Sequence, residues 1–172
     1  MAESAPDALK GEDWAGEMGE RWLASLDRFE GMIAPIGAAL LARADYRPGE
    51  RVLDLGCGGG ATTLAIAEAV GPGGAVLGLD IAPMLVEAAT RRAADAHSTA
   101  RFVCADAATA TLEEPPFDRL FSRFGSMFFA EPVAAFANIR AMLKPGARID
   151  LAVWAHPRDN AWMMEVMGVV RA

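Results

Sequence analysis

The N-terminal part of the chain changes from a polar segment to an apolar pattern with helical spacing. We expect the polar residues 1–18 to form a flexible N-terminus. From Gly19 onward, apolar residues recur every three or four positions, which is typical of an amphipathic helix. The residues that set this period are Trp22, Leu26, Phe29, Ile33, Ile36 and Leu40. Pro35 supplies no backbone donor, so it should kink or split the helix.

From residue 51 onward, short apolar runs alternate with longer segments of helical period. The short runs predict buried strands over residues 51–55, 75–79, 101–105, 118–123 and 147–154. The longer segments predict helices over residues 61–70, 83–94, 132–144 and 161–171. Pro83 and Pro132 suit a first helical turn, and Asn160 suits an N-cap.

This alternation predicts the fold class. Strands that alternate with helices favour an α/β fold with a doubly wound, mostly parallel sheet and helices on both faces. Right-handed crossovers, with a reversal after the third strand, place the first strand in the middle of the sheet. We therefore expect one domain over residues 19–172 behind the flexible segment.

Composition and charge narrow the choice of partners. Hydrophobic residues make up 53% of the chain and charged residues 23%, which is typical of a globular domain. The net charge is −7 and no basic run is present, which argues against nucleic acid as a partner. Cys57 and Cys104 have no paired spacing and suit a reducing compartment. Neither a signal peptide nor an apolar stretch of ~20 residues occurs, so we expect a cytoplasmic protein without a membrane partner.

The strongest chemical signal is the segment that follows the first predicted strand. Residues 56–60 read Gly-Cys-Gly-Gly-Gly and lead directly into a predicted helix. Glycines let backbone donors and acceptors approach a ligand closely. The helix N-terminus adds a favourable end for negative charge. This context predicts a ligand-binding loop more strongly than a simple tight turn.

Three carboxylates bear on which ligand this loop would take. The loop also satisfies the dinucleotide fingerprint, and Asp80 lies at the distance expected of a ribose-binding acid, so these features fit a nicotinamide cofactor too. Asp54 lies at the end of an apolar strand and would need a partner, such as a bound ammonium group. Asp106 follows the third strand and could accept from an adenine amino group, or it could cap the loop. Asp54 and Asp106 favour S-adenosylmethionine over a nicotinamide.

Several segments together resemble the Rossmann-like (class I) S-adenosylmethionine-dependent methyltransferases. Residues 52–60, Val-Leu-Asp-Leu-Gly-Cys-Gly-Gly-Gly, resemble the first motif of that family, 77–80 the second, and 104–107 the third. Residues 118–129 and 143–146 are similar to the fourth-strand region and to the turn before the fifth strand. Within the superfamily, the chain is most similar to the ubiquinone/menaquinone-biosynthesis-like small-molecule methyltransferases.

The resemblance implies a cofactor, S-adenosyl-L-methionine, and a set of residues around it. The implied cofactor-binding residues are Asp54, Gly56, Cys57, Gly58, Asp80, Ile81, Met84, Asp106, Ala107 and Arg123. Among them, Asp80 should hold the ribose hydroxyls, and Arg123 should lie under the methyl group or its acceptor. The residues implied to border the acceptor are Trp22, Phe124, Met127 and Phe128. Arg21, next to Trp22, could help to close the pocket.

The chain departs from the family at its C-terminal end. The family sheet normally has seven strands, and the sequence here provides five. We therefore expect the domain to be C-terminally incomplete, or its fifth strand to be covered by a partner, such as a second copy in a homo-oligomer.

Other kinds of chemistry find little support in the sequence. Tyr46 is the only tyrosine and lacks the lysine that a short-chain dehydrogenase would place four residues later. His97 and His156 have no metal-ligand spacing to the cysteines, so no metal site is predicted. Downstream of the fourth strand, the candidate general bases are placed by no motif, so the catalytic residue stays unassigned. These bases are Glu131, Asp150, His156, Asp159 and Glu165.

These observations favour transfer of a methyl group from S-adenosylmethionine to a small, apolar or aromatic acceptor. Two alternatives remain open. One is a nicotinamide-dependent oxidoreductase, and the other is a catalytically silent cofactor-binding or interaction domain. The incomplete sheet gives weight to the second alternative.

Overall fold

The computed structural model describes residues 11–114 and 116–170. Three helices precede the sheet: α1 (Gly11–Trp14), α2 (Glu17–Ala24) and α3 (Leu26–Ala44). The strands are β1 (Arg51–Leu55), β2 (Ala75–Asp80), β3 (Arg101–Cys104), β4 (Phe117–Arg123) and β5 (Leu143–Ala152). The later helices are α4 (Ala61–Val70), α5 (Pro83–Asp95), α6 (Pro132–Ala141) and α7 (Ala161–Val170), with short 3₁₀ turns η1 (Gly125–Met127) and η2 (Pro157–Asp159).

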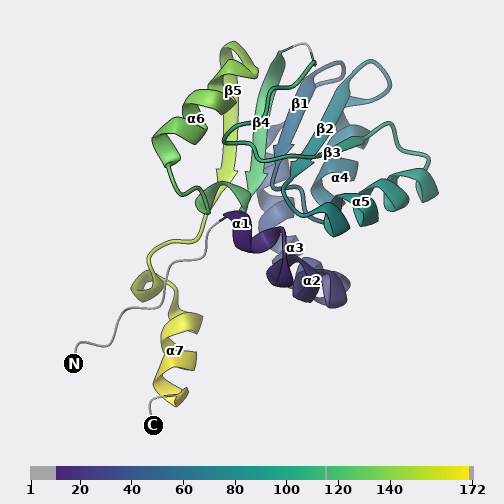
Figure 1. Cartoon of the computed structure of the whole chain (residues 1–172). Coiled ribbons are helices and arrows are strands. Elements are labelled where there is room, and N and C mark those ends of the chain that lie inside the picture. The colour runs from purple at the N-terminus through teal and green to yellow at the C-terminus, as the bar shows by residue number, and fades with distance from the viewer. Residues whose placement is uncertain (1–10, 115, 171–172) are drawn as a thin grey trace.

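The five strands form one parallel sheet in the order β3-β2-β1-β4-β5. The chain builds outward from β1 to β3, then returns to place β4 on the other side of β1 (Figure 1). The predicted α/β class, the parallel pairing and the central first strand are confirmed. Such a reversal opens a crevice outside the carboxyl ends of the strands, where ligands of open α/β sheets bind.

The core lies on both faces of this sheet because its strands are apolar on both sides. On one face, Leu53, Leu77 and Leu120 pack with Ile139 of α6. On the other, a cluster that includes Val52 joins the strands to α4 and to partly buried residues of α3. The central strands are therefore rigid supports for the loops at their carboxyl ends.

The N-terminal helices differ from the sequence expectation. The chain divides at Ser25, between α2 and α3, and Pro35 lies inside the uninterrupted α3. Ile33 and Gly37, two positions before and after Pro35, are buried, so packing against the domain supports the helix on both sides of the proline. The predicted flexible segment falls partly on residues 1–10, outside the described residues. Its remainder contains α1 and the start of α2.

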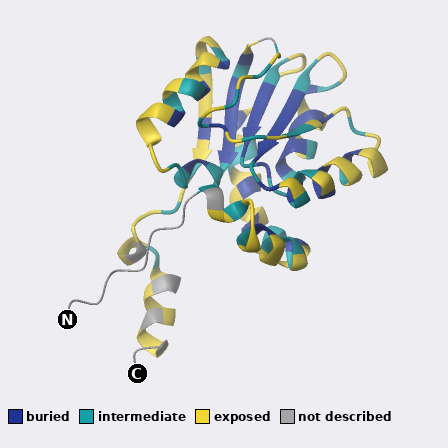
Figure 2. Ribbon diagram, in the orientation of Figure 1, coloured by how far each residue is buried: buried dark blue, intermediate teal, exposed yellow. Residues whose placement is uncertain are grey.

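The edge strand β5 is the most exposed strand of the sheet (Figure 2). It begins at Leu143, four residues earlier than predicted, with a register shift against β4. Ile149, Leu151 and Val153 are 49%, 36% and 54% exposed. Helix α7, which extends away from the sheet in Figure 1, also exposes apolar side chains. None of the described helices is long and apolar enough to cross a membrane.

Candidate cofactor and acceptor pocket

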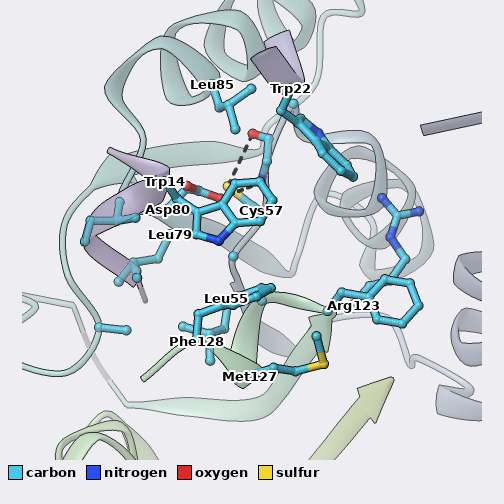
Figure 3. Close-up of a pocket in the computed structure, with 18 of the residues that line it drawn as sticks. Trp14, Trp22, Leu55, Cys57, Leu79, Asp80, Leu85, Arg123, Met127 and Phe128 are labelled. Carbon is cyan, nitrogen blue, oxygen red and sulfur yellow. Dashed lines mark hydrogen bonds between the residues drawn. The ribbon is translucent and has the colours of Figure 1, made fainter. Parts of the chain in front are cut away.

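A pocket of about 400 Å³ opens at the carboxyl ends of β1, β2 and β4, in the crevice created by the reversed strand order. Its floor is the glycine loop after β1 and the ends of the strands. Aromatic side chains from α1, α2 and the segment after β4 surround it (Figure 3).

The glycine loop approaches its surroundings so closely that side chains would not fit at several positions. Gly56 has φ +66°, and a Cβ there would lie 2.5 Å from the Cα of Gly125 in the turn after β4. The loops after β1 and β4 therefore touch backbone to backbone. Gly58 has φ +54°, but a Cβ there would meet nothing within 4 Å, because this residue faces the open pocket. Gly60, with φ +85°, is the N-cap of α4.

Asp80, the last residue of β2, is fixed beneath the glycine loop. Its Oδ2 accepts from the Gly58 N–H at 2.8 Å (Figure 3), and its Oδ1 accepts from the Ala82 N–H at 3.0 Å. Burial raises the pKa of this carboxyl, while the backbone donors oppose the rise. A carboxylate has about four acceptor positions, so two remain for hydroxyl groups of a ligand.

Asp54 has a different position from Asp80. It is 1% exposed and is not among the residues that line the pocket. Its Oδ2 accepts from the hydroxyls of Thr62 and Thr63, at 2.8 and 2.7 Å, at the start of α4. Burial raises its pKa to about 6, with the two hydroxyl bonds opposing. Oδ1 is buried and has no hydrogen-bond partner among the described residues.

The side of the pocket next to β2 and β3 suits a flat, mainly apolar group with a polar edge. Ile81, Leu85 and Ala107 line it together with Asp106. Asp106 is exposed. Its Oδ1 accepts from the Ala108 N–H at 2.8 Å, so its side chain also caps the start of the loop after β3. Both interpretations of Asp106 given by the sequence are therefore compatible with its position. Met84 does not line the pocket.

Aromatic residues distant in the sequence meet at the opposite side. Phe124 has φ +64° and stacks on Trp154, which follows β5, with ring centroids 4.4 Å apart. Trp14 of α1 contacts both Trp22 and Phe128. A left-handed conformation is strained for a large side chain, and strained residues cluster at ligand sites. The wall can accept a planar apolar molecule.

The helix α3 is held over the glycine loop by charged groups. Arg92 of α5 donates to the Gly59 carbonyl at 3.1 Å and pairs with Glu30 and Asp27 of α3, both at 2.6 Å. Glu30 also lines the pocket. The N-terminal helices are thus connected to the loop that would hold the ligand.

Most of the predicted residues lie together in this pocket. Those lining it are Gly56, Cys57, Gly58, Asp80, Ile81, Asp106, Ala107, Arg123, Trp22, Phe124, Met127 and Phe128. Residues that the sequence reasoning missed also line it, and those include Trp14, Glu30, Ile33, Gly125 and Trp154. In the sequence, only their aromatic character marked Trp14 and Trp154 as candidates. Their positions beside the pocket depend on how α1 and the segment after β5 pack in the folded chain.

The candidate bases do not meet in the pocket. None of the five is among its lining residues. Asp150, for example, is buried in ion pairs with Arg119 and Arg148. Among the described residues, no group of three or more His, Cys, Asp or Glu side chains could hold a metal ion. Both cysteines are free, Cys57 buried and Cys104 exposed.

Comparison with known proteins identifies the family of this chain. A family model described as a methyltransferase domain matches residues 52–146. The chain is 36% identical to nocamycin O-methyltransferase of Saccharothrix syringae over 118 residues, which are 68% of this chain and 42% of that protein. It is 35% identical to aklanonic acid methyltransferase of a Streptomyces species over 116 residues, which are 67% of this chain and 53% of the relative.

Solved structures show the same architecture. A TehB-like SAM-dependent methyltransferase from Corynebacterium glutamicum superposes with a TM-score of 0.62 and 26% identity. The superposition covers 88% of this chain and 83% of that one. The chain spans about half or less of the length of the two curated relatives described above.

Proposed function

Because this chain belongs to the methyltransferase-domain family and has the fold of class I S-adenosylmethionine-dependent methyltransferases, we propose that it binds S-adenosylmethionine and transfers its methyl group to a small acceptor. The names of its relatives favour this activity, since one is an O-methyltransferase and another acts on aklanonic acid. We propose that the acceptor is likewise a small molecule, apolar or aromatic.

One observation carries the proposal: a single pocket joins a glycine cradle and a buried acid to an aromatic wall. The open space above Gly58 lets a ligand touch the backbone, and Asp80 has free acceptor positions for ribose hydroxyls. The unpartnered Oδ1 of Asp54, behind the loop, is a buried polar atom of the kind that a bound water or ligand would satisfy. These residues fit the cofactor.

In the proposed mechanism, the protein contributes mainly by positioning. The cofactor supplies a reactive sulfonium-bound methyl group when it is bound. The glycine loop and Asp80 orient the nucleoside, while Phe124, Trp154 and Met127 place the acceptor and exclude water. Well-oriented reactants alone can remove ~7–11 kcal/mol of a barrier, whereas a general base adds only ~10²–10⁴-fold. We therefore assign no catalytic base.

Ligand binding tests this function. S-adenosylhomocysteine at 100-fold over its dissociation constant should stabilise the chain by ~2.7 kcal/mol in thermal unfolding, while NAD should not. Stabilisation by NAD alone would support the oxidoreductase alternative instead. Stabilisation by neither compound would favour an interaction domain.

We further propose that the protein acts in the cytoplasm, since both cysteines are free thiols.

We also propose that β5, an edge strand with exposed apolar side chains, pairs with a second copy of the chain.

A further inference from the structure

Arg123 is a charged residue of the pocket that makes no hydrogen bond or ion pair with the other described residues. It ends β4 and lines the cavity, on the opposite side from Asp80 in Figure 3. Throughout the part of the chain that the structure describes, its guanidinium makes neither a hydrogen bond nor an ion pair. We propose that Arg123 binds a carboxylate of the ligand, and this inference rests on the proposed function of the pocket.

The position of Arg123 is fixed by the sheet and by α3. Phe121 pairs with Asp54 of β1, so Arg123, two residues later, projects to the same face of the sheet as Asp54. On that face the guanidinium lies against α3, where a Cβ at Gly37 would come within 2.8 Å of its Nη1. The close contact with a glycine limits the movement of this side chain.

The two acids that act electrostatically on Arg123, Glu30 and Asp54, each have one oxygen engaged with another group. Glu30 gives its Oε2 to Arg92, and Asp54 gives its Oδ2 to two threonine hydroxyls. Both acids favour the charged form of Arg123 at a distance, but burial outweighs them and lowers its pKa below the ordinary value. A guanidinium nevertheless stays charged in proteins, so its five donors are available to a ligand in the pocket.

An unpaired cation in a partly dry pocket is costly, and a ligand oxyanion would offset that cost. A guanidinium presents a planar fork that matches a carboxylate with two parallel hydrogen bonds. Two sources of a carboxylate are compatible with this site. One is the amino-acid end of the cofactor, which would lie beside the glycine loop and α3, and the other is an acidic acceptor on the aromatic wall.

The first experimental arm tests the cofactor as the source. Calorimetry would compare S-adenosylhomocysteine with 5′-methylthioadenosine, which keeps the nucleoside thioether but lacks the amino acid. If the cofactor carboxylate binds Arg123, Arg123→Met should weaken S-adenosylhomocysteine binding by about ten- to a hundredfold and leave methylthioadenosine unchanged. Arg123→Lys, which keeps the charge but loses the fork, should recover part of the affinity. Arg140→Met, at an exposed position of α6, is the matched control.

The second arm tests the acceptor as the source. With S-adenosylhomocysteine present, tryptophan fluorescence would report binding of 2-naphthoate and of its neutral counterpart, 2-naphthamide. If the acceptor carboxylate binds Arg123, the wild type should prefer the naphthoate, and Arg123→Met should lose this preference.

The outcomes distinguish failure of the Arg123 inference from failure of the proposed function. Loss of carboxylate-dependent affinity in either arm supports the role of Arg123 and identifies the source. Unchanged affinity in both arms, with folding of the variant checked by circular dichroism, would overturn it while leaving the methyltransferase function intact. If wild-type protein binds neither nucleoside, the proposed function itself fails and this inference with it.

Discussion

The acids Asp54 and Asp80 show how residues of one type receive different environments. Both are buried strand residues close to the glycine loop. Asp80 is held by backbone N–H groups and borders the pocket, whereas Asp54 is held by threonine hydroxyls and lies behind it. We therefore expect Asp80 to control ligand affinity and Asp54 to control the pH dependence of stability.

Replacement of Asp80 should weaken cofactor binding. Asp80→Ala removes the acceptor proposed for both ribose hydroxyls, so affinity for S-adenosylhomocysteine should fall by about ten- to a hundredfold in calorimetry. Asp95→Ala, at the exposed end of α5, should have no effect. Unchanged affinity in a folded Asp80 variant would remove this residue from the site.

Replacement of Asp54 should change how stability depends on pH. The folded pKa of about 6 lies above the ordinary 3.8, so the folded state keeps a proton that the unfolded chain has lost. Between pH 4 and 6, stability of the wild type should therefore decrease as pH rises, by up to about 3 kcal/mol from this group. Asn does not titrate, so the free energy of unfolding of Asp54→Asn should not fall over this range. Urea unfolding should therefore show the stability of the variant increasing relative to that of the wild type as pH rises. Parallel pH profiles would contradict this assignment.

At the scale of elements, the contact between two loops fixes the pocket. Gly56 after β1 and Gly125 after β4 approach so closely that neither can carry a side chain. Gly58 has similar backbone geometry but faces open space. The same substitution at the two positions should therefore have different consequences.

Alanine at Gly56 should mainly destabilise the fold, and alanine at Gly58 should mainly weaken binding. A Cβ at Gly56 would lie 2.5 Å from the Gly125 backbone, which forces the loops apart and should cost several kcal/mol in chemical unfolding. Gly58→Ala should cost only about 1 kcal/mol of strain from its positive φ, yet impair binding of S-adenosylhomocysteine by filling the cradle. If Gly58→Ala bound the cofactor normally, close backbone approach at this loop would not be needed.

At the scale of the whole molecule, the apolar edge formed by β5 is the main uncovered surface of the sheet. Exposed edge strands with apolar side chains favour pairing with another chain. We expect the isolated chain to associate through this strand, and light scattering should show a mass that increases with concentration. The double substitution Ile149→Lys/Val153→Lys should abolish the association. Val133→Lys on α6, at a position that is 87% exposed, should not. A monomer at every concentration would argue against pairing through β5.

The sequence by itself determined most of the strands and helices from residue 51 onward, and the part of the pocket that lies within a continuous segment. Residues 51–60 pass from an apolar strand through glycines into a helix, and this local order predicted a ligand loop. Asp80 was found because it follows the next apolar run. These features depend on interactions between residues that are close in the sequence, so the spacing of apolar residues and glycines along the chain is enough to predict them. The parallel sheet followed for the same reason, since alternating strands and helices permit few arrangements.

Only the tertiary structure decided how distant segments meet. Trp14 and Trp154 reach one pocket from nearly opposite ends of the described chain, and Gly125 closes on Gly56. Asp54 and Arg123 leave adjacent strands on the same face, yet only Arg123 borders the pocket, whereas Asp54 is buried beneath the start of α4. Such contacts depend on packing across the sheet, and packing joins residues whose separation along the chain carries no periodic signal.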